Sequence, residues 1–184
     1  MIKSIKILAI ALMLPAGMAF GQKLVDKTGK ISIFSHTSVE DISADNYKVV
    51  STINTETGEM IFVVPMQSFE FEKAMMQKHF NSKKHLDTQT YPKAKFKGKI
   101  TDLSAVDFNK DGEYEVTVKG TMTMHGETKE LTQKGKITVK GGKVTATTKM
   151  KLTLADYKVG YEKGKPSTNI AKTIDIDVHT EYTK

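Results

Sequence analysis

The sequence predicts an all-β fold with one short helix, in which an antiparallel sheet closes into a barrel. Three observations carry this prediction. Apolar and polar residues alternate with period two from residue 94 onward, turn signals separate the alternating segments, and one segment of the first half breaks the pattern. A two-sheet sandwich is the alternative architecture for such a pattern, and we favour the barrel.

In the second half of the chain, the alternation assigns side chains to the two faces of the sheet. One segment predicts an inward face made of Tyr114, Val116, Val118, Met122 and Met124. A later segment, which follows the tight-turn pair Gly141 and Gly142, predicts an inward face made of Val144, Ala146, Met150, Leu152 and Leu154. The last strand contributes Ile174, Ile176 and Val178.

In the first half, residues 31–35 predict a short strand, and residues 47–54 and 59–66 predict a hairpin whose turn ends at Gly58. The segment from 68 to 80 breaks the alternation. Its apolar residues have helical spacing, so it predicts a short amphipathic helix with Ser68 as the N-cap.

The N-terminus predicts a secretory signal peptide over residues 1–21. Lys3 and Lys6 precede a short apolar run, and a small-x-small cleavage site ends at Gly21. We therefore expect a mature protein of residues 22–184 that forms a single domain and is exported to the periplasm or the extracellular space. The apolar run is too short to span a bilayer and no other stretch is long enough, so no transmembrane segment is expected.

Composition excludes several classes of function. The chain has no cysteine, which removes disulfides, thiolate metal sites and a lipid-anchoring cysteine. All 28 basic residues are lysine, and they are scattered, so the guanidinium groups that suit nucleic-acid contacts are absent. Nucleic acid is therefore not an expected partner.

No motif predicts catalysis or a resident cofactor. The histidines lack zinc-protease spacing, and no phosphate loop or serine elbow is present. Asp175 and Asp177 alternate with apolar residues, which places them on the solvent face of a strand. The acidic loop that starts at Asp107 resembles a calcium loop but lacks the final bidentate glutamate, so a plain hairpin loop is favoured. We expect a protein that is not an enzyme, with no catalytic residue and no metal site.

Flexible and aromatic apolar side chains are unusually numerous, and they suggest a channel for an apolar chain. Methionine adapts to pliable ligands, and an eight-stranded barrel is wide enough to hold one slim ligand or to be filled by its own side chains. The predicted channel-lining residues are Phe62, Met66, Phe69, Met76, Phe80, Phe96, Met122, Met124 and Met150. The alternative is that these residues only pack the core.

Two segments resemble the signatures of a known family. His79 and Phe80, followed after a ten-residue spacer by the run from Tyr91 to Phe96, resemble the pattern R-D-x-H-L, spacer, Y-P-x-A-x-F of the YceI-like family of exported lipid-binding proteins. The run from Gly120 to Lys129 resembles that family's second signature, G-x-L-T-I-H-G-V-T-K. The matching motif residues are His79, Asp87, Tyr91, Pro92, His125 and Gly126.

The resemblance implies an eight-stranded antiparallel, lipocalin-like barrel whose apolar channel holds a polyisoprenoid chain. By position, it implies that Phe80, Phe96, Met122 and Met124 face the channel, while His125 and Gly126 turn the chain. The sequence departs from the family pattern just before His79, where Met76 and Gln77 stand in place of the Arg-Asp pair. This departure makes that end of the pocket more apolar.

Three hypotheses follow for the function. The first is a periplasmic or secreted protein that carries or sequesters an amphiphilic or isoprenoid lipid, such as a prenyl or quinone chain. The second is a secreted stress or interaction protein whose barrel is filled by side chains. The third is a lipid-modifying enzyme, for which His79 and His125 are the candidate residues. The oligomeric state stays open, with a homodimer as one option.

Overall fold

The computed structural model describes residues 22–37, 41–162, 165–166 and 171–183. The predicted signal peptide, residues 1–21, lies outside the described residues. Among the residues that are described, no helix is long and apolar enough to cross a membrane.

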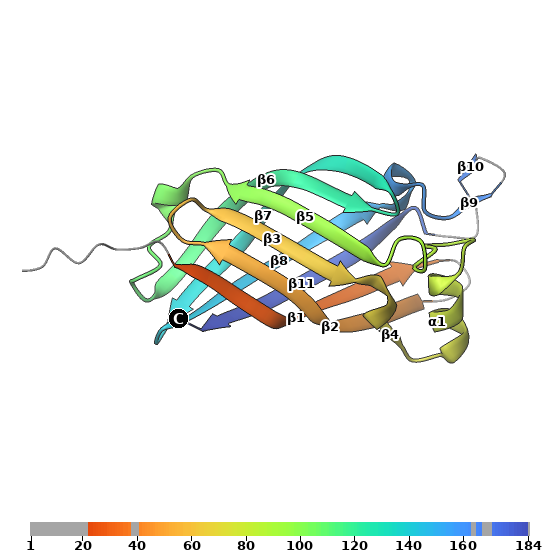
Figure 1. The fold of residues 1–184 in the computed structure, drawn as a ribbon, viewed down its shortest axis with the longest axis horizontal. Coiled ribbons are helices and arrows are strands. Elements are labelled where there is room, and N and C mark those ends of the chain that lie inside the picture. The colour runs from red at the N-terminus through yellow and green to blue at the C-terminus, as the bar shows by residue number, and fades with distance from the viewer. Residues whose placement is uncertain (1–21, 38–40, 163–164, 167–170, 184) are drawn as a thin grey trace, which may run out of the picture.

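Eight strands form a closed antiparallel barrel (Figure 1). The strands are β1 (Lys23–His36), β2 (Asp41–Asn54), β3 (Glu59–Pro65), β5 (Lys93–Ile100), β6 (Gly112–Met124), β7 (Glu127–Lys140), β8 (Lys143–Thr153) and β11 (Thr173–Thr183). Their order around the barrel is β1-β11-β8-β7-β6-β5-β3-β2, and β2 pairs back onto β1 to close the sheet. The predicted eight-stranded antiparallel barrel is therefore confirmed.

The remaining elements are short, and most of them lie at one end of the barrel. They are the 3₁₀ turns η1 (Met66–Ser68), η2 (Leu103–Ala105) and η3 (Leu154–Tyr157), the strands β4 (Glu70–Phe71), β9 (Tyr161–Glu162) and β10 (Lys165–Pro166), and the helix α1 (Ala74–Asn81). In Figure 1, α1, β9 and β10 are at the end of the barrel opposite the C-terminus.

The two tightest turns lie at Gly141 and Gly142, as the glycines predict, and at His125 and Gly126, as the family resemblance implies. Gly141 and Gly142, between β7 and β8, have φ values of 56° and 80°. His125 and Gly126, between β6 and β7, have φ values of 51° and 79°. Two consecutive residues with positive φ form the turn whose twist matches that of paired strands, and this explains the direct strand-to-strand connections.

The predicted helix begins too early. Ser68 is not its N-cap but the last residue of η1, and the helix begins at Ala74 after Lys73, which makes no side-chain cap. The intervening segment is extended because β4 pairs with β2, with Phe71 opposite Ala44. Pairing with a distant strand thus overrides the local helical spacing.

The first strand is longer than the alternation predicts, because a bulge interrupts its pattern. The register of β1 against β2 shifts between Asp26 and Gly29. The inward and outward alternation of side chains before the bulge is therefore out of step with the alternation after it. Asp26 is buried there and accepts hydrogen bonds from the backbone N–H groups of Thr28, at 2.8 Å, and Glu181, at 2.9 Å. β1 therefore begins at Lys23 rather than at residue 31.

The interior divides into two clusters along the barrel axis. The first cluster fills the end at which the C-terminus lies, which we call the closed end, and consists of Leu24, Ile53, Met60, Ile100, Val106, Phe108, Val116, Val118, Ile137, Val139, Val144, Ala146 and Tyr182. The second cluster lies at the α1 end and consists of Ile31, Ala44, Val49, Met66, Phe69, Leu86, Ala94, Met124, Leu152, Leu154, Tyr157 and Val159. Many partly buried apolar residues accompany this second cluster.

Tyr182 anchors the closed end. Its side chain is fully buried, and its hydroxyl lies 2.8 Å from the Ser51 hydroxyl and 3.1 Å from the Thr180 hydroxyl. Burial penalises the phenolate and raises the pKa of Tyr182 to about 12. The phenol therefore stays neutral in the folded protein at a pH where an unfolded chain would already ionise it.

This pKa predicts an alkaline loss of stability. Below about pH 10 the phenol is protonated in both states, and between pH 10 and 12 only the unfolded state ionises. The free energy of unfolding therefore falls as the pH rises through this window, by about 3 kcal/mol in total. Urea denaturation of the wild type and of Tyr182→Phe, measured from pH 8 to 12, checks this. The variant should lose about 1 kcal/mol at pH 8 because Ser51 loses its partner.

The two proteins share every other ionisable group, so the comparison isolates the phenol. Above pH 10, the free energy of unfolding of Tyr182→Phe should fall less steeply with pH than that of the wild type. Parallel pH profiles for the two proteins would contradict the assignment.

Candidate functional site

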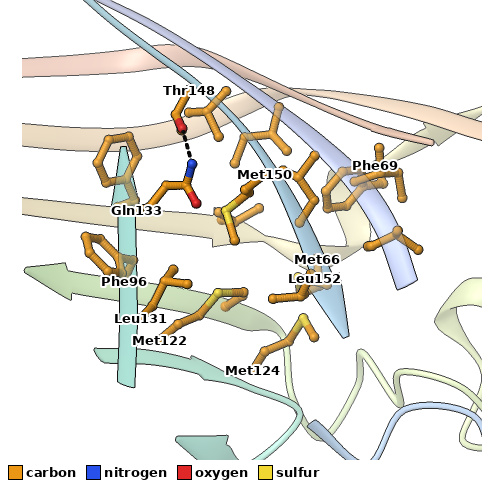
Figure 2. Close-up of a pocket in the computed structure, with 18 of the residues that line it drawn as sticks. Met66, Phe69, Phe96, Met122, Met124, Leu131, Gln133, Thr148, Met150 and Leu152 are labelled. Atoms are coloured by element: carbon orange, nitrogen blue, oxygen red, sulfur yellow. Dashed lines mark hydrogen bonds between the residues drawn. The ribbon is translucent and has the colours of Figure 1, made fainter. Parts of the chain in front are cut away.

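A cavity of about 400 Å³ lies inside the barrel and extends from inner members of the closed-end cluster, such as Met60 and Val118, to α1 (Figure 2). Its size lies within the range of pockets that bind small organic ligands. Its wall is mostly apolar and includes every predicted channel-lining residue, namely Phe62, Met66, Phe69, Met76, Phe80, Phe96, Met122, Met124 and Met150. The structure thus brings the predicted set together around one space, and contact with a ligand stays a prediction.

Strand pairing aligns the aromatic and methionine side chains at the middle of the cavity. Phe62 of β3 pairs with Phe96 of β5, which in turn pairs with Met122 of β6. The rings of Phe62 and Phe96 lie 6.3 Å apart between centroids. Gly98 provides the room for this arrangement, because a Cβ at that position would lie 2.4 Å from the Phe96 ring.

The helix α1 covers the end of the cavity. Its residues Met76, His79 and Phe80 all line the wall. The Phe80 ring packs against the rings of Phe69 and Phe71, at centroid distances of 5.3 Å and 5.0 Å. This aromatic cluster attaches the short helix, which has no buried residue of its own, to the barrel rim.

Two histidines stand at this covered end. The rings of His79 and His85 stack at 6.0 Å with an interplanar angle of 14°, and both line the cavity. The Ser82 hydroxyl is 2.9 Å from Nδ1 of His85. Among the described residues no group of three or more histidine, cysteine or carboxylate side chains could hold a metal ion.

Much of the cavity wall consists of residues outside the predicted lining set. The predicted lining contains only methionine and phenylalanine, whereas β-branched and leucine residues supply as much of the wall: Ile31, Ile33, Ile42, Val64, Leu86, Leu131, Leu152, Leu154, Ile174, Ile176 and Val178. The alternating pattern already placed several of these inside the sheet. The same alternation puts two polar residues, Gln133 and Thr148, on the inner face, but their residue type gives no reason to expect them in an apolar wall.

Charged groups lie at the edges of the cavity or outside the barrel. Of the described residues, no carboxylate lines the cavity. Lys136 lines one edge, and its hydrogen bond to Glu113, at 2.8 Å, raises the pKa of its ammonium group. Asp175 and Asp177 face solvent, as predicted, and form ion pairs with Lys151 and Lys149 at 2.7 Å and 3.2 Å.

Most residues of the two family signatures lie outside the cavity wall. Asp87 adopts a positive φ of 39°, and its carbonyl accepts hydrogen bonds from the N–H groups of Thr90 and Tyr91, at 2.9 Å and 2.8 Å. The Pro92 carbonyl accepts from the N–H of Met66 at 2.9 Å. These bonds shape the connection from α1 to β5.

His125 joins the two signatures. Its ring meets the Tyr91 ring edge-on at 4.9 Å, and its Nδ1 donates to the carbonyl of Tyr157 at 3.0 Å. The carbonyl can only accept, so Nδ1 carries the proton. Gly126 lies so close to Tyr91 that a Cβ would be 2.9 Å from its ring. His125 does not line the cavity, so of the two histidines considered for catalysis only His79 borders it.

The family model for the YceI-like domain matches residues 23–182, which is nearly the whole described barrel. The chain belongs to the YceI-like family. No curated protein matches it by sequence.

Solved structures match this YceI-like chain in fold. A polyisoprenoid binding domain from Saccharophagus degradans matches with a TM-score of 0.73 at 17% identity. The match covers 89% of this chain and 99% of the S. degradans chain. Burkholderia cenocepacia BcnA matches with a TM-score of 0.71 at 19% identity, over 84% of this chain and 96% of the BcnA chain. A Campylobacter jejuni YCEI protein has a TM-score of 0.60 at 14% identity, with coverages of 81% and 88%. At these identities the likeness concerns the fold.

The position of His125 predicts a structural role that a substitution can test. His125→Asn keeps a residue that tolerates positive φ but removes the bond to Tyr157 and the contact with Tyr91. We expect the free energy of unfolding to fall by about 1 kcal/mol. Urea denaturation measures this loss, and the affinity for a prenyl alcohol should be unchanged. A large loss of affinity in a folded variant would contradict the structural role.

Proposed function

We propose that this YceI-like protein binds an amphiphilic or isoprenoid lipid in the barrel cavity and acts outside the cytoplasm as a carrier or sequestering protein. The observation that carries this proposal is the cavity of about 400 Å³ whose wall is mostly apolar and rich in methionine and phenylalanine. Such side chains contact an apolar chain closely without demanding one shape of it.

The energetics of apolar burial support a chain-like ligand. Removing each methylene group from water is worth about 0.8 kcal/mol, so affinity accumulates along a chain that the cavity encloses. One methylene changes selectivity by only about 1 to 3 kcal/mol, so the wall by itself separates chains of similar width poorly. The S. degradans neighbour, described as a polyisoprenoid binding domain, supports the choice of an isoprenoid as first candidate.

The alternative of a barrel filled by its own side chains has support at the closed end only. There the packed cluster around Tyr182 fills the interior. Beyond it, the cavity leaves space that the side chains of the second cluster do not occupy. We therefore retain lipid binding as the proposed function.

Export is the second part of the proposal. The basic start, the apolar run and the cleavage site within residues 1–21 support it, and the predicted cut before Gln22 would leave β1, which begins at Lys23, intact. N-terminal sequencing of the protein from the periplasm or medium of its native cells should give Gln22 as the first residue. An uncleaved protein confined to the cytoplasm would contradict export.

Bound lipid is the direct test of the binding proposal. Mass spectrometry of an organic extract of the protein, purified from its native source, should show an isoprenoid or other chain lipid in a stoichiometric amount. Absence of any lipid, together with no binding of geranylgeraniol, a prenyl quinone or a fatty acid to the purified protein, would overturn the proposal.

A matched pair of variants tests whether the cavity is the binding site. Val178 lines the cavity on β11, whereas Val25 on β1 is 44% exposed to solvent. Val178→Phe places a ring in the space of the ligand and should weaken geranylgeraniol binding about tenfold or more, while Val25→Phe should leave it unchanged. Titration calorimetry measures the affinities, and denaturation curves confirm that both variants fold. Equal affinities for both folded variants would place the ligand elsewhere.

A further inference from the structure

The barrel wall contains a seam between β7 and β8. The two strands pair from Lys140 opposite Lys143 to Lys136 opposite Thr147, and their described ladder ends there. Beyond this point β7 continues its ladder with β6, and β8 continues with β11. In the half that holds the cavity, two neighbouring strands therefore diverge, and some of their backbone groups lose ladder partners.

The side chain of Gln133 closes the start of this seam. Its amide nitrogen Nε2 lies 2.9 Å from the carbonyl oxygen of Lys134, 3.0 Å from that of Lys149, and 3.0 Å from Oγ1 of Thr148. The Thr148 hydroxyl also donates to the Lys134 carbonyl, at 2.6 Å. The amide thus provides hydrogen bonds across the gap where the backbone ladder has stopped.

These partners determine the orientation of the amide. Backbone carbonyl oxygens can only accept hydrogen bonds, so the NH₂ group must face the seam and the oxygen Oε1 must face the opposite way. Figure 2 shows this oxygen on the side away from Thr148, directed into the space that Met150 lines. The structure therefore presents a hydrogen-bond acceptor to an apolar cavity.

The acceptor has no protein donor. Among the hydrogen bonds of the described residues none reaches Oε1 of Gln133, whereas Nε2 makes three close contacts. No fully buried side-chain polar atom of the described residues lacks a partner, so this oxygen keeps some exposed surface. An apolar ligand that covered it would leave it desolvated without a partner, which is costly.

We propose that Gln133 selects lipids that carry a hydrogen-bond donor, such as the hydroxyl of a prenyl alcohol or a hydroquinone, over lipids with acceptors only, such as ethers and quinones. The inference rests on the proposed lipid-binding function and names the ligand class for that site. Gln133 pairs with Val118 of the closed-end cluster, so the donor-bearing end of the ligand reaches the inner end of the cavity. The chain then runs toward α1.

A comparison of two matched ligands tests this selectivity. Geranylgeraniol and its methyl ether share one chain, but only the alcohol donates a hydrogen bond. Titration calorimetry with the mature wild-type protein should give an affinity for the alcohol that is about fivefold to tenfold higher than for the ether. In Gln133→Met, which keeps the length of the side chain without the amide, the ratio of the two affinities should fall to about one.

Gln67→Met is the matched control. Gln67 is exposed, it also donates to a backbone carbonyl, that of Thr88 at 3.1 Å, and it lies outside the cavity wall. Its replacement should leave the alcohol-to-ether ratio at the wild-type value. A ratio that stays high in Gln133→Met, or that falls equally in Gln67→Met, would overturn the role of Gln133.

If Gln133→Met fails to fold, a second pair of ligands tests the selectivity on the wild-type protein alone. The wild type should then bind decylubiquinol, measured under reducing conditions, more tightly than decylubiquinone, measured under oxidising conditions. Only the quinol can donate a hydrogen bond. Equal binding of alcohol and ether, or of quinol and quinone, overturns the selectivity and leaves lipid binding intact. Absence of binding by every one of these ligands overturns both the selectivity and the proposed function.

Discussion

The pairing of β2 with β1 is the constraint on which the rest of the structure depends. This contact closes the antiparallel sheet and gives every barrel strand two neighbours. Closure with eight strands encloses an interior that side chains can fill completely or leave hollow. Both outcomes occur along the axis, because Tyr182 and its neighbours fill the closed end, whereas the interior toward α1 keeps a cavity of about 400 Å³.

Closure also produces the features that give the cavity its chemistry. The closed sheet is irregular at the bulge of β1 at Asp26, where the register shifts, and at the seam between β7 and β8, where the ladder ends. Each irregularity frees backbone groups that a polar side chain must satisfy. Asp26 accepts hydrogen bonds at the bulge, and Gln133 donates them at the seam. Polar atoms inside this barrel therefore lie where the sheet is irregular, and one of them faces the cavity.

Most residues of the two family signatures hold connections between barrel elements in place. Tyr91 from the first contacts His125 and Gly126 from the second, which fixes the connection from α1 to β5 against the turn between β6 and β7. The departure from the family pattern before His79 has a structural use as well. Met76 lines the cavity, and the Gln77 side chain accepts a hydrogen bond from the N–H of Phe71, at 3.3 Å. Met76 thus contributes an apolar side chain to the covered end, and Gln77 ties α1 to β4.

The sequence by itself determined most of the barrel strands, the tight turn at Gly142 and the inward side chains of β6, β8 and β11, because period-two alternation and turn glycines are local properties of a chain. The family resemblance implied the turn at His125 and Gly126. The sequence also indicated the aromatic and methionine residues on the strands that line the cavity, namely Phe62, Phe96, Met122, Met124 and Met150, because alternation assigns them to the inner face of the sheet. Only the tertiary structure decided that the helix begins at Ala74, that β1 begins at Lys23 and that the amide nitrogen of Gln133 bonds across the seam to β8. Each of these depends on a strand distant in sequence: β2 for the extended segment before the helix, β2 and β11 for the bulge, and β8 for the amide of Gln133. Local periodicity contains no information about such partners, so these features emerged only when the strands were placed side by side.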